Sequence, residues 1–237
     1  MKTKLFLILF SAFFSGLAFA AHTGTLYEIN SKRSKVLFHS EATLIPPSDP
    51  AKSLREKLTI TYKDPEGNLA FEQQATLEGS RLIQEEIQQK QLGQTALIEV
   101  KDGKVFFTKV VDGKESTSSE KLGGTLVTTG NFQRFVQDHW KEIAAGDTVD
   151  FRFGVWDRQE TVGFKIFKIG EEKIGADQAL VLKMKPTSFL IAALVDPLIF
   201  KYKADGSELL EMKGRVAPKQ KVGSKWKDLD AEVVYAN

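Results

Sequence analysis

Cysteine is absent from this chain of 237 residues. Its absence excludes disulfides, a thiolate nucleophile and a lipid anchor attached to cysteine. Histidine is scarce, with three residues, and the sequence has no HExxH, no glycine-rich phosphate loop and no GxSxG motif. A structural zinc site usually needs four nitrogen or sulfur ligands. We therefore expect no metal site and no cofactor, and stability that comes from a hydrophobic core.

Two further features are missing after residue 20. Residues 21–237 carry 31 basic and 31 acidic side chains, and no segment concentrates Lys and Arg on one face, so nucleic acid is not an expected partner. The longest apolar run extends from Phe189 to Val195, whereas a spanning helix needs about 20 apolar residues. We therefore expect no transmembrane segment once the leader is removed.

The first twenty residues have the three parts of a secretory signal peptide. Lys2 and Lys4 precede an apolar segment at 5–14, and Ala18-Phe19-Ala20 has the small-residue pattern of a cleavage site. We predict that residues 1–20 are removed on export and that residues 21–237 form a single β-rich domain. An exported chain of this size without disulfides is more typical of bacteria, so we expect it in the periplasm or secreted from the cell.

Strand and turn signals alternate along the rest of the chain. Residues 148–155 alternate apolar and polar side chains, as in a strand with one buried face. The segment 82–90 has a composition that suits a helix, but its position among strands favours another strand. Turn signals recur roughly every 8 to 12 residues, which is typical of a meandering all-β domain. They are Asp64 to Asn68, Asp102-Gly103, Asp112-Gly113, Gly123-Gly124 and Asp205-Gly206.

Two segments predict helices. Apolar residues recur at helical spacing over about 131–145, where Asn131 is placed to cap the first turn and Gly146 to end the last, so we expect one amphipathic helix there. A second, short and apolar helix is expected over about 187–195. The fold class predicted is mainly β: an antiparallel barrel or strongly curved half-barrel that carries these two helices.

A series of motifs runs through the second half of the chain. They are Phe132, Phe135 and His139-Trp140, then Gly146-Asp147, Val149, Phe151 and Phe153, then Arg158 and Glu160 to Phe164, and finally Met184, Pro186, Ser188, Asp196-Pro197 and Gly214-Arg215. In these motifs the sequence resembles an uncharacterised family of bacterial exported β-rich proteins, a domain of unknown function. The resemblance implies a β-rich exported domain and supplies no activity. At the level of architecture, the curved sheet with a helix is similar to periplasmic lipoprotein carriers, which implies nothing about function by itself.

The densest group of polar and aromatic residues is the candidate site. If the helix at 131–145 packs on the hairpin that follows it, these side chains form a polar rim at the mouth of a pocket. The simpler interpretation is that His139 and Trp140 pack against the core and that the hairpin residues form ordinary surface ion pairs. The candidate residues are His139, Trp140, Arg152, Trp156, Arg158 and Glu160.

Phenylalanine gives a second indication of function. Of 17 phenylalanines, five lie in the first twenty residues and many others lie on predicted strands, where they either line a cavity for an apolar ligand or simply fill the core. The apolar helix would then act as a lid through Phe189, Leu190 and Leu194. We therefore expect a non-enzymatic protein that binds an apolar small molecule, a lipid or an envelope protein.

Two other classes stay open on the sequence. A hydrolytic or envelope-modifying enzyme would use His139 with Glu160 or Asp157 as acid and base, and would need these groups close together in an accessible cleft. A structural assembly protein would instead expose an apolar patch.

Overall fold

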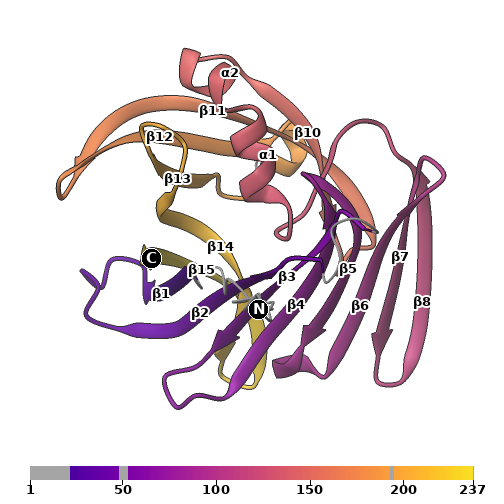
Figure 1. Ribbon diagram of the computed structural model, residues 1–237. Helices are drawn as coiled ribbons and strands as arrows, with labels where there is room; N and C mark the ends of the chain where they lie inside the picture. The colour runs from indigo at the N-terminus through magenta and orange to yellow at the C-terminus, as the bar shows by residue number, and fades with distance from the viewer. Residues whose placement is uncertain (1–21, 48–52, 193–194, 237) are drawn as a thin grey trace, which may run out of the picture.

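Fifteen strands form one sheet in the computed structural model, which describes residues 22–47, 53–192 and 195–236. The predicted signal peptide at 1–20 lies outside the described residues. The strand order is linear, β8-β7-β6-β5-β4-β3-β2-β1-β15-β14-β13-β12-β11-β10-β9. The sheet curls strongly, so that β8 comes to lie near β10 and β11 (Figure 1). The prediction of a mainly β, strongly curved half-barrel is confirmed.

The elements follow one another along the chain with short connections. They are β1 (His22–Glu28), β2 (Val36–Ile45), β3 (Arg55–Lys63), β4 (Leu69–Glu78), β5 (Arg81–Gln89), the 3-10 helix η1 (Lys90–Leu92), β6 (Gln94–Lys101), β7 (Lys104–Val111), β8 (Lys114–Lys121), β9 (Leu126–Val127), α1 (Phe132–Asp138), α2 (Trp140–Ala145), β10 (Val149–Val155), β11 (Glu160–Ile174), β12 (Asp177–Pro186), α3 (Phe189–Ala192), β13 (Leu198–Lys203), β14 (Leu209–Val222) and β15 (Lys225–Ala236).

Tight turns set the hairpins where the sequence places Asp-Gly pairs. Asp102 and Gly103 have φ values of 52° and 70°, and Asp112 and Gly113 have 50° and 73°. Two successive residues with positive φ match a type I′ turn, whose twist suits the two strands that it joins. The pairs join β6 to β7 and β7 to β8. The segment 82–90, for which a strand was favoured, is β5.

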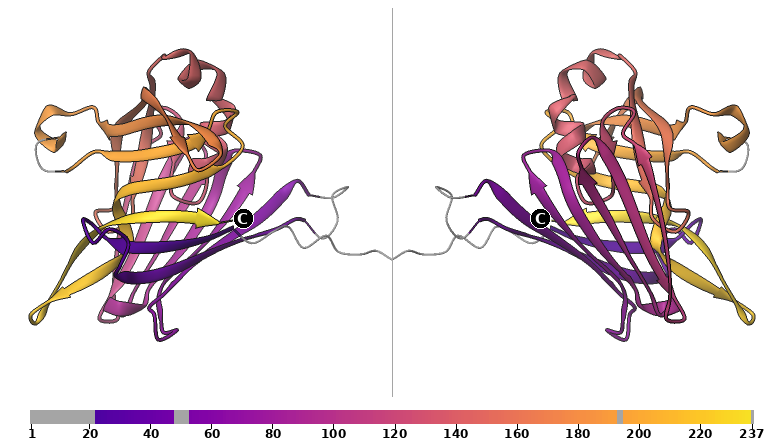
Figure 2. Two further views of the ribbon diagram at one scale, coloured as in Figure 1. Left: turned by 90° about the vertical axis from the view of Figure 1, so that its left-hand side faces the viewer. Right: turned by 90° about the vertical axis from the view of Figure 1, so that its right-hand side faces the viewer.

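The two ends of the barrel carry different turns. Every neighbouring pair from β8 to β10 in the sheet order is antiparallel, so alternate turns lie at the same end. The β1–β2 turn, α3 and the β14–β15 turn lie at one end, and the end of β2 and the start of β3 lie at the other (Figure 2). We call these the β14–β15 end and the β2–β3 end.

The concave face of the sheet is apolar and is covered in part by α1 and α2. The largest cluster packs Phe135 and Val136 of α1 and Ile143 of α2 against strands β10 to β13. The rings of Phe135 and Phe151 lie 4.8 Å apart. A second cluster lies among β3 to β7 and β9, and a third joins β1, β2 and β4 to β14 and β15.

The helices differ in detail from the expectation. The segment 131–145 forms two helices instead of one, because His139 leaves the helical conformation with φ −101° and ψ 11°. Asn131 stands before α1 but its side chain does not cap it. Its amide donates instead to the carbonyl oxygens of Ser80 and Leu126, both at 3.0 Å, which ties the start of α1 to the β4–β5 turn. Gly146 ends α2 with φ 99°, as predicted.

Candidate functional site

One edge of the sheet, β8, meets the β10–β11 turn and the start of β11 along a line that we call the seam. It consists of Ser116, Ser118 and Glu120 on β8, Gln159 in the turn, and Glu160 and Thr161 at the start of β11. These three β8 residues alternate along the strand, so their side chains share one face. Among the described residues, β8 pairs through its main chain with β7 alone. The seam is therefore bridged by side chains where a closed barrel would have a main-chain ladder.

Each of the three β8 side chains has a partner across the seam. The Ser116 hydroxyl donates to Gln159 Oε1 at 2.8 Å, and the Ser118 hydroxyl donates to the Gln159 carbonyl oxygen. Glu120 Oε1 accepts the main-chain N–H of Thr161 at 2.8 Å. Hydrogen bonds of this kind contribute about 0.5–1.5 kcal/mol each, and those at exposed positions compete with water. The seam should therefore open more easily than any ladder of paired strands.

Gln159 is the central residue of the seam. Its backbone is left-handed, with φ 56°, in the turn between β10 and β11. Its side-chain amide donates to the carbonyl oxygens of Ser116, at 2.9 Å, and of Phe107, at 3.4 Å. A non-glycine residue with positive φ is uncommon and persists where the surrounding contacts hold it. The Gln159 side chain thus joins β8 and β7 to this turn.

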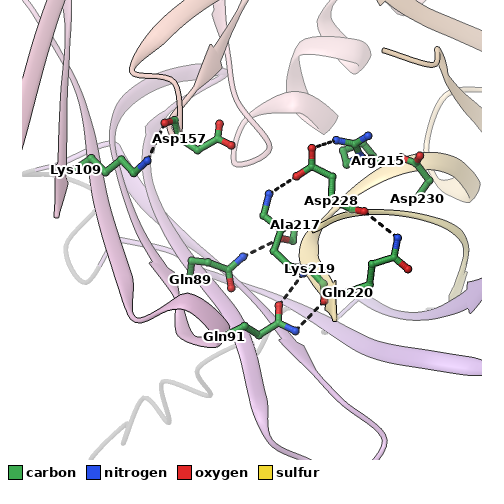
Figure 3. Close-up of polar contacts among 10 residues, drawn as sticks. All are labelled: Gln89, Gln91, Lys109, Asp157, Arg215, Ala217, Lys219, Gln220, Asp228 and Asp230. Carbon is green, nitrogen blue, oxygen red and sulfur yellow. Dashed lines mark hydrogen bonds and ion pairs between the residues drawn. The ribbon is translucent and has the colours of Figure 1, made fainter. Parts of the chain in front are cut away.

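Four of the residues that the sequence singled out lie at or next to the seam. Arg152 donates through Nε to the Thr161 hydroxyl at 2.8 Å, and Arg158 pairs with Glu160 at 2.6 Å. Trp156 packs against the second apolar cluster, and the ammonium of Lys109 lies 5.8 Å from its ring centroid. Lys109 also donates to the carbonyl oxygen of Asp157 at 2.9 Å (Figure 3).

His139 and Trp140 belong to a different part of the molecule. The His139 ring lies 4.8 Å from the Phe135 ring, and its Nδ1 is 3.3 Å from Glu142 Oε2. Trp140 packs on Tyr202, with ring centroids 5.6 Å apart. Within the described part of the chain, His139 forms no hydrogen bond with Glu160 or Asp157. The structure therefore does not bring His139 into contact with either of these two carboxyl groups.

The short apolar helix lies at the β14–β15 end. Phe189 is 86% exposed, whereas Ile191 packs against the large apolar cluster. Leu190 belongs to the same helix, and Leu194 lies outside the described residues. The role of this helix as a lid stays a prediction.

The buried residues next to the seam are mostly apolar. Phe107 and Leu126 of the second cluster are 1% and 6% exposed. Gln73, Glu85 and Gln89 are buried on β4 and β5, and one polar atom of each has no hydrogen-bond partner among the described residues. This part of the core therefore combines apolar side chains with a few buried polar groups.

Glu85 has an unusual electrostatic environment. Burial raises the pKa of its carboxyl group from 4.5 to about 7, and hydrogen bonding to Thr128 and Gly130 offsets part of that rise. A β carbon on Gly130 would lie 2.8 Å from Glu85 Oε1 and 2.5 Å from the Ala75 β carbon, so only glycine fits here. The loop between β9 and α1 therefore packs tightly on this carboxyl group.

At the β14–β15 end, β14 bends across the barrel opening. A bulge between Val216 and Lys219 brings its main chain to β5 and η1, where the Gln89 side-chain amide donates to the Ala217 carbonyl oxygen at 3.1 Å (Figure 3). Burial favours a higher pKa for Asp228, but Lys219 and Arg215 outweigh it and hold the pKa below its ordinary value. This network holds the main chain of β14 beside β5 and η1.

A shallow depression lies elsewhere on the surface. An open depression of about 240 Å³ on the convex face of β1 to β3 includes His39, Glu41 and Lys63. Nothing in its contacts indicates a ligand. In the part of the chain that the structure describes, no three acidic or histidine side chains lie together as a metal site, and no helix is long and apolar enough to cross a membrane.

The fold defines this chain as a mainly β protein built on one large, strongly curved sheet that is not closed. Its structure is similar to the crystal structure of a beta-barrel-like protein of the domain of unknown function DUF1849 from Brucella abortus. The TM-score is 0.51 at 12% sequence identity, over 91% of this chain and 93% of that one. At this identity the likeness shows the fold alone. No family model and no curated protein matches the sequence.

Sequence reasoning missed the β8 half of the seam. The segment 114–121 reads KESTSSEK, and charged and polar residues throughout a strand are a signal of a sheet edge. That signal identifies an edge strand but not its partner. Gln159 carries no recognisable signal in the sequence.

Proposed function

We propose that this protein is exported to the periplasm, or secreted, and binds an apolar, lipid-like molecule there without catalysing a reaction. One observation carries the proposal: the edge strand β8 meets the β10–β11 turn and β11 through side-chain hydrogen bonds, next to a buried apolar cluster. The Gln159 amide reaches the carbonyl oxygen of Phe107, whose side chain belongs to that cluster. Separation of β8 from β11 at the seam would give an apolar chain a lateral path to the concave face.

The buried polar groups suggest what the ligand carries. An apolar tail would lie among the residues of the second cluster, and a hydroxyl, amide or ester group would satisfy the free atoms of Gln73 and Gln89. Such polar groups fix the orientation of a ligand in a site that is otherwise apolar. This combination fits a fatty acid, a monoacyl lipid or another single-chain amphiphile.

The test is native mass spectrometry of the protein recovered from the periplasm of an expressing bacterium. We expect a mass excess that organic extraction releases as lipid, and binding of the fluorescent probe 11-(dansylamino)undecanoic acid after extraction. A bare mass together with no probe binding would contradict the proposal. Recovery of a bound protein instead of a lipid would contradict the proposed ligand and indicate an envelope protein as the partner.

Neighbouring phenylalanines on β7 supply a matched pair of variants. Phe107 is 1% exposed and faces the interior, whereas Phe106 is 37% exposed on the opposite face. Phe107→Leu, which keeps the site apolar, should weaken probe binding several-fold, and Phe106→Leu should leave it unchanged. Equal binding by the two variants would place the probe elsewhere.

A further inference from the structure

The tip of the β14–β15 hairpin is basic and apolar at once. Residues 221–227 read KVGSKWK, with three lysines and no acidic residue. Val222 is 47% exposed and Trp226 is 40% exposed. None of the three lysines forms an ion pair with another residue in the described ranges. The acidic residues of β15 lie further from the turn, where Asp228 pairs with Lys219 and Arg215.

The hairpin geometry presents charge and apolar surface on both faces. Lys221 is paired with Trp226 across the strands, and its ammonium lies 5.9 Å from the indole centroid. Val222 is paired with Lys225 on the opposite face. The hairpin extends beyond the body of the barrel (Figure 2). A plane that meets the tip can therefore contact the indole and the lysines together.

Two other segments extend from the same end. Phe189 of α3 is 86% exposed, the largest exposed fraction among the large apolar side chains of the described residues. Lys32 lies exposed in the β1–β2 turn. Both segments project to the same side as the hairpin (Figure 2). An exposed aromatic side chain and an exposed cation thus lie at the same end as the hairpin.

We propose that the β14–β15 end docks on the surface of a membrane that contains anionic phospholipid. Trp226 would enter the headgroup region, where an aromatic ring with a polar edge is favoured, and Phe189 would insert its apolar ring beside it. The lysines would keep their ammonium groups at the phosphates while their alkyl chains lie along the apolar layer. Each cation near an anionic surface strengthens binding by about fivefold, so the three hairpin lysines together contribute about 100-fold.

Membrane docking accounts for the pairing of lysine with tryptophan better than a purely solvated surface does. A solvated hairpin gains nothing from an exposed indole and valine at its tip. An anionic bilayer, by contrast, complements both the positive charge and the apolar side chains.

The experiment measures how much of the protein, purified from the periplasm, sediments with lipid vesicles. Mass spectrometry first determines the N-terminus of the purified protein. Vesicles of phosphatidylcholine alone are compared with vesicles in which one lipid in four is phosphatidylglycerol and the rest are phosphatidylcholine. We expect binding to the anionic vesicles at 50 mM salt, a loss of binding at 300 mM salt and little binding to phosphatidylcholine. Tryptophan emission of a Trp140→Phe/Trp156→Phe variant, which reports Trp226, should shift to the blue on binding.

Matched variants distinguish docking through the β14–β15 hairpin from a general attraction of the protein's lysines to anionic vesicles. Lys221→Gln/Lys225→Gln/Lys227→Gln should reduce the partition coefficient about 100-fold. The control Lys101→Gln/Lys104→Gln/Lys121→Gln removes the same charge at exposed positions of the β2–β3 end and should change partition little. Trp226→Ser should weaken binding to the vesicles that contain phosphatidylglycerol.

Two outcomes would overturn the proposal. One is equal loss of binding in the two lysine variants, and the other is no binding to anionic vesicles at 50 mM salt. Binding of the probe 11-(dansylamino)undecanoic acid to the protein is measured without vesicles. Failure of membrane docking can therefore be distinguished from failure of ligand binding.

Discussion

The side chain of Gln91 pairs with the main chain of Lys219 through two hydrogen bonds. Gln91 Oε1 accepts the Lys219 N–H at 2.7 Å, and Gln91 Nε2 donates to the Lys219 carbonyl oxygen at 2.9 Å (Figure 3). The carboxamide thus replaces the missing partner strand beside β14 where β14 leaves the regular ladder. This pair links segments 128 residues apart and holds the bend across the barrel.

Replacing Gln91 by Ala should lower the free energy of unfolding by about 2 kcal/mol, because both main-chain groups of Lys219 lose their partner. Urea denaturation measures the change. Gln88→Ala on β5 is the control, since no hydrogen bond of its side chain is formed with the described residues, and it should cost less than about 0.5 kcal/mol. Equal destabilisation by the two variants would show that the Gln91 pair does not hold the bend.

Glu85 should make the stability depend on pH. Its carboxyl group has a pKa of about 7 when folded, against 4.5 when exposed, so the folded state binds the proton more tightly. The free energy of unfolding should therefore fall as pH rises from about 4.5 to about 7, by about 3 kcal/mol in total, and stay low above pH 7.

Glu85→Gln removes this titration. We expect the variant to be more stable than the natural protein at pH 8 and to lose less stability between pH 5 and pH 8. Glu86→Gln, at the exposed neighbouring position, serves as the control. Its free energy of unfolding should depend on pH as that of the natural protein does. Urea denaturation at the two pH values measures these changes. If Glu85→Gln lost as much stability between pH 5 and pH 8 as the natural protein, Glu85 would not be the group responsible.

Gly206 should tolerate no side chain, because Trp140 occupies the space. A β carbon there would lie 2.6 Å from Trp140 Cγ, and the residue has φ 77°. Gly206→Ala should therefore cost about 3 kcal/mol, from the steric clash together with the backbone strain. Gly113→Ala, at φ 73° with no atom within 4 Å of the new carbon, should cost only about 1 kcal/mol. Similar losses for the two variants would show that Trp140 does not pack there.

Gln159→Ala should loosen the seam. The variant removes the side-chain bonds to Ser116 and to the Phe107 carbonyl oxygen, so β8 should exchange its amide hydrogens faster while β5 and β6 keep their protection. Hydrogen exchange followed by mass spectrometry resolves the two regions. The control is Gln84→Ala, whose side chain bonds only to Glu86 on the same strand. Unchanged exchange in β8 would mean that Gln159 does not close the seam.

Local signals predicted the strands and turns, because alternation in β10 and the Asp-Gly pairs are properties of a few consecutive residues. The break at His139 was missed, since it depends on packing of the neighbouring Phe135 and Trp140 rings against strands that follow in the chain. The seam joins Ser118 to Gln159 over a separation of 41 residues. Such pairings depend on the curvature of the whole sheet, which no short segment encodes.

The candidate site was also predicted in part from local sequence and in part not. The residues from Arg152 to Glu160 form a polar cluster that the sequence identified, and the structure places it at the seam. His139 was grouped with them on the assumption that the helix packs on their hairpin at that point. The helix packs instead through Phe135 and Trp140 on β10 and β13, which leaves His139 beside Glu142.

The central claim is that ligand enters through the seam, and a reversible lock across it tests this most directly. The chain has no cysteine, so Ser116→Cys/Gln159→Cys, whose natural side chains are 2.8 Å apart, can be joined by a disulfide-containing bismaleimide. The control Thr59→Cys/Gln74→Cys joins two strands that are already paired. Uptake of 11-(dansylamino)undecanoic acid should be at least tenfold slower in the locked protein, recover after dithiothreitol cleaves the linker, and be unaffected in the control. Uptake at the natural rate with the seam locked would contradict the account.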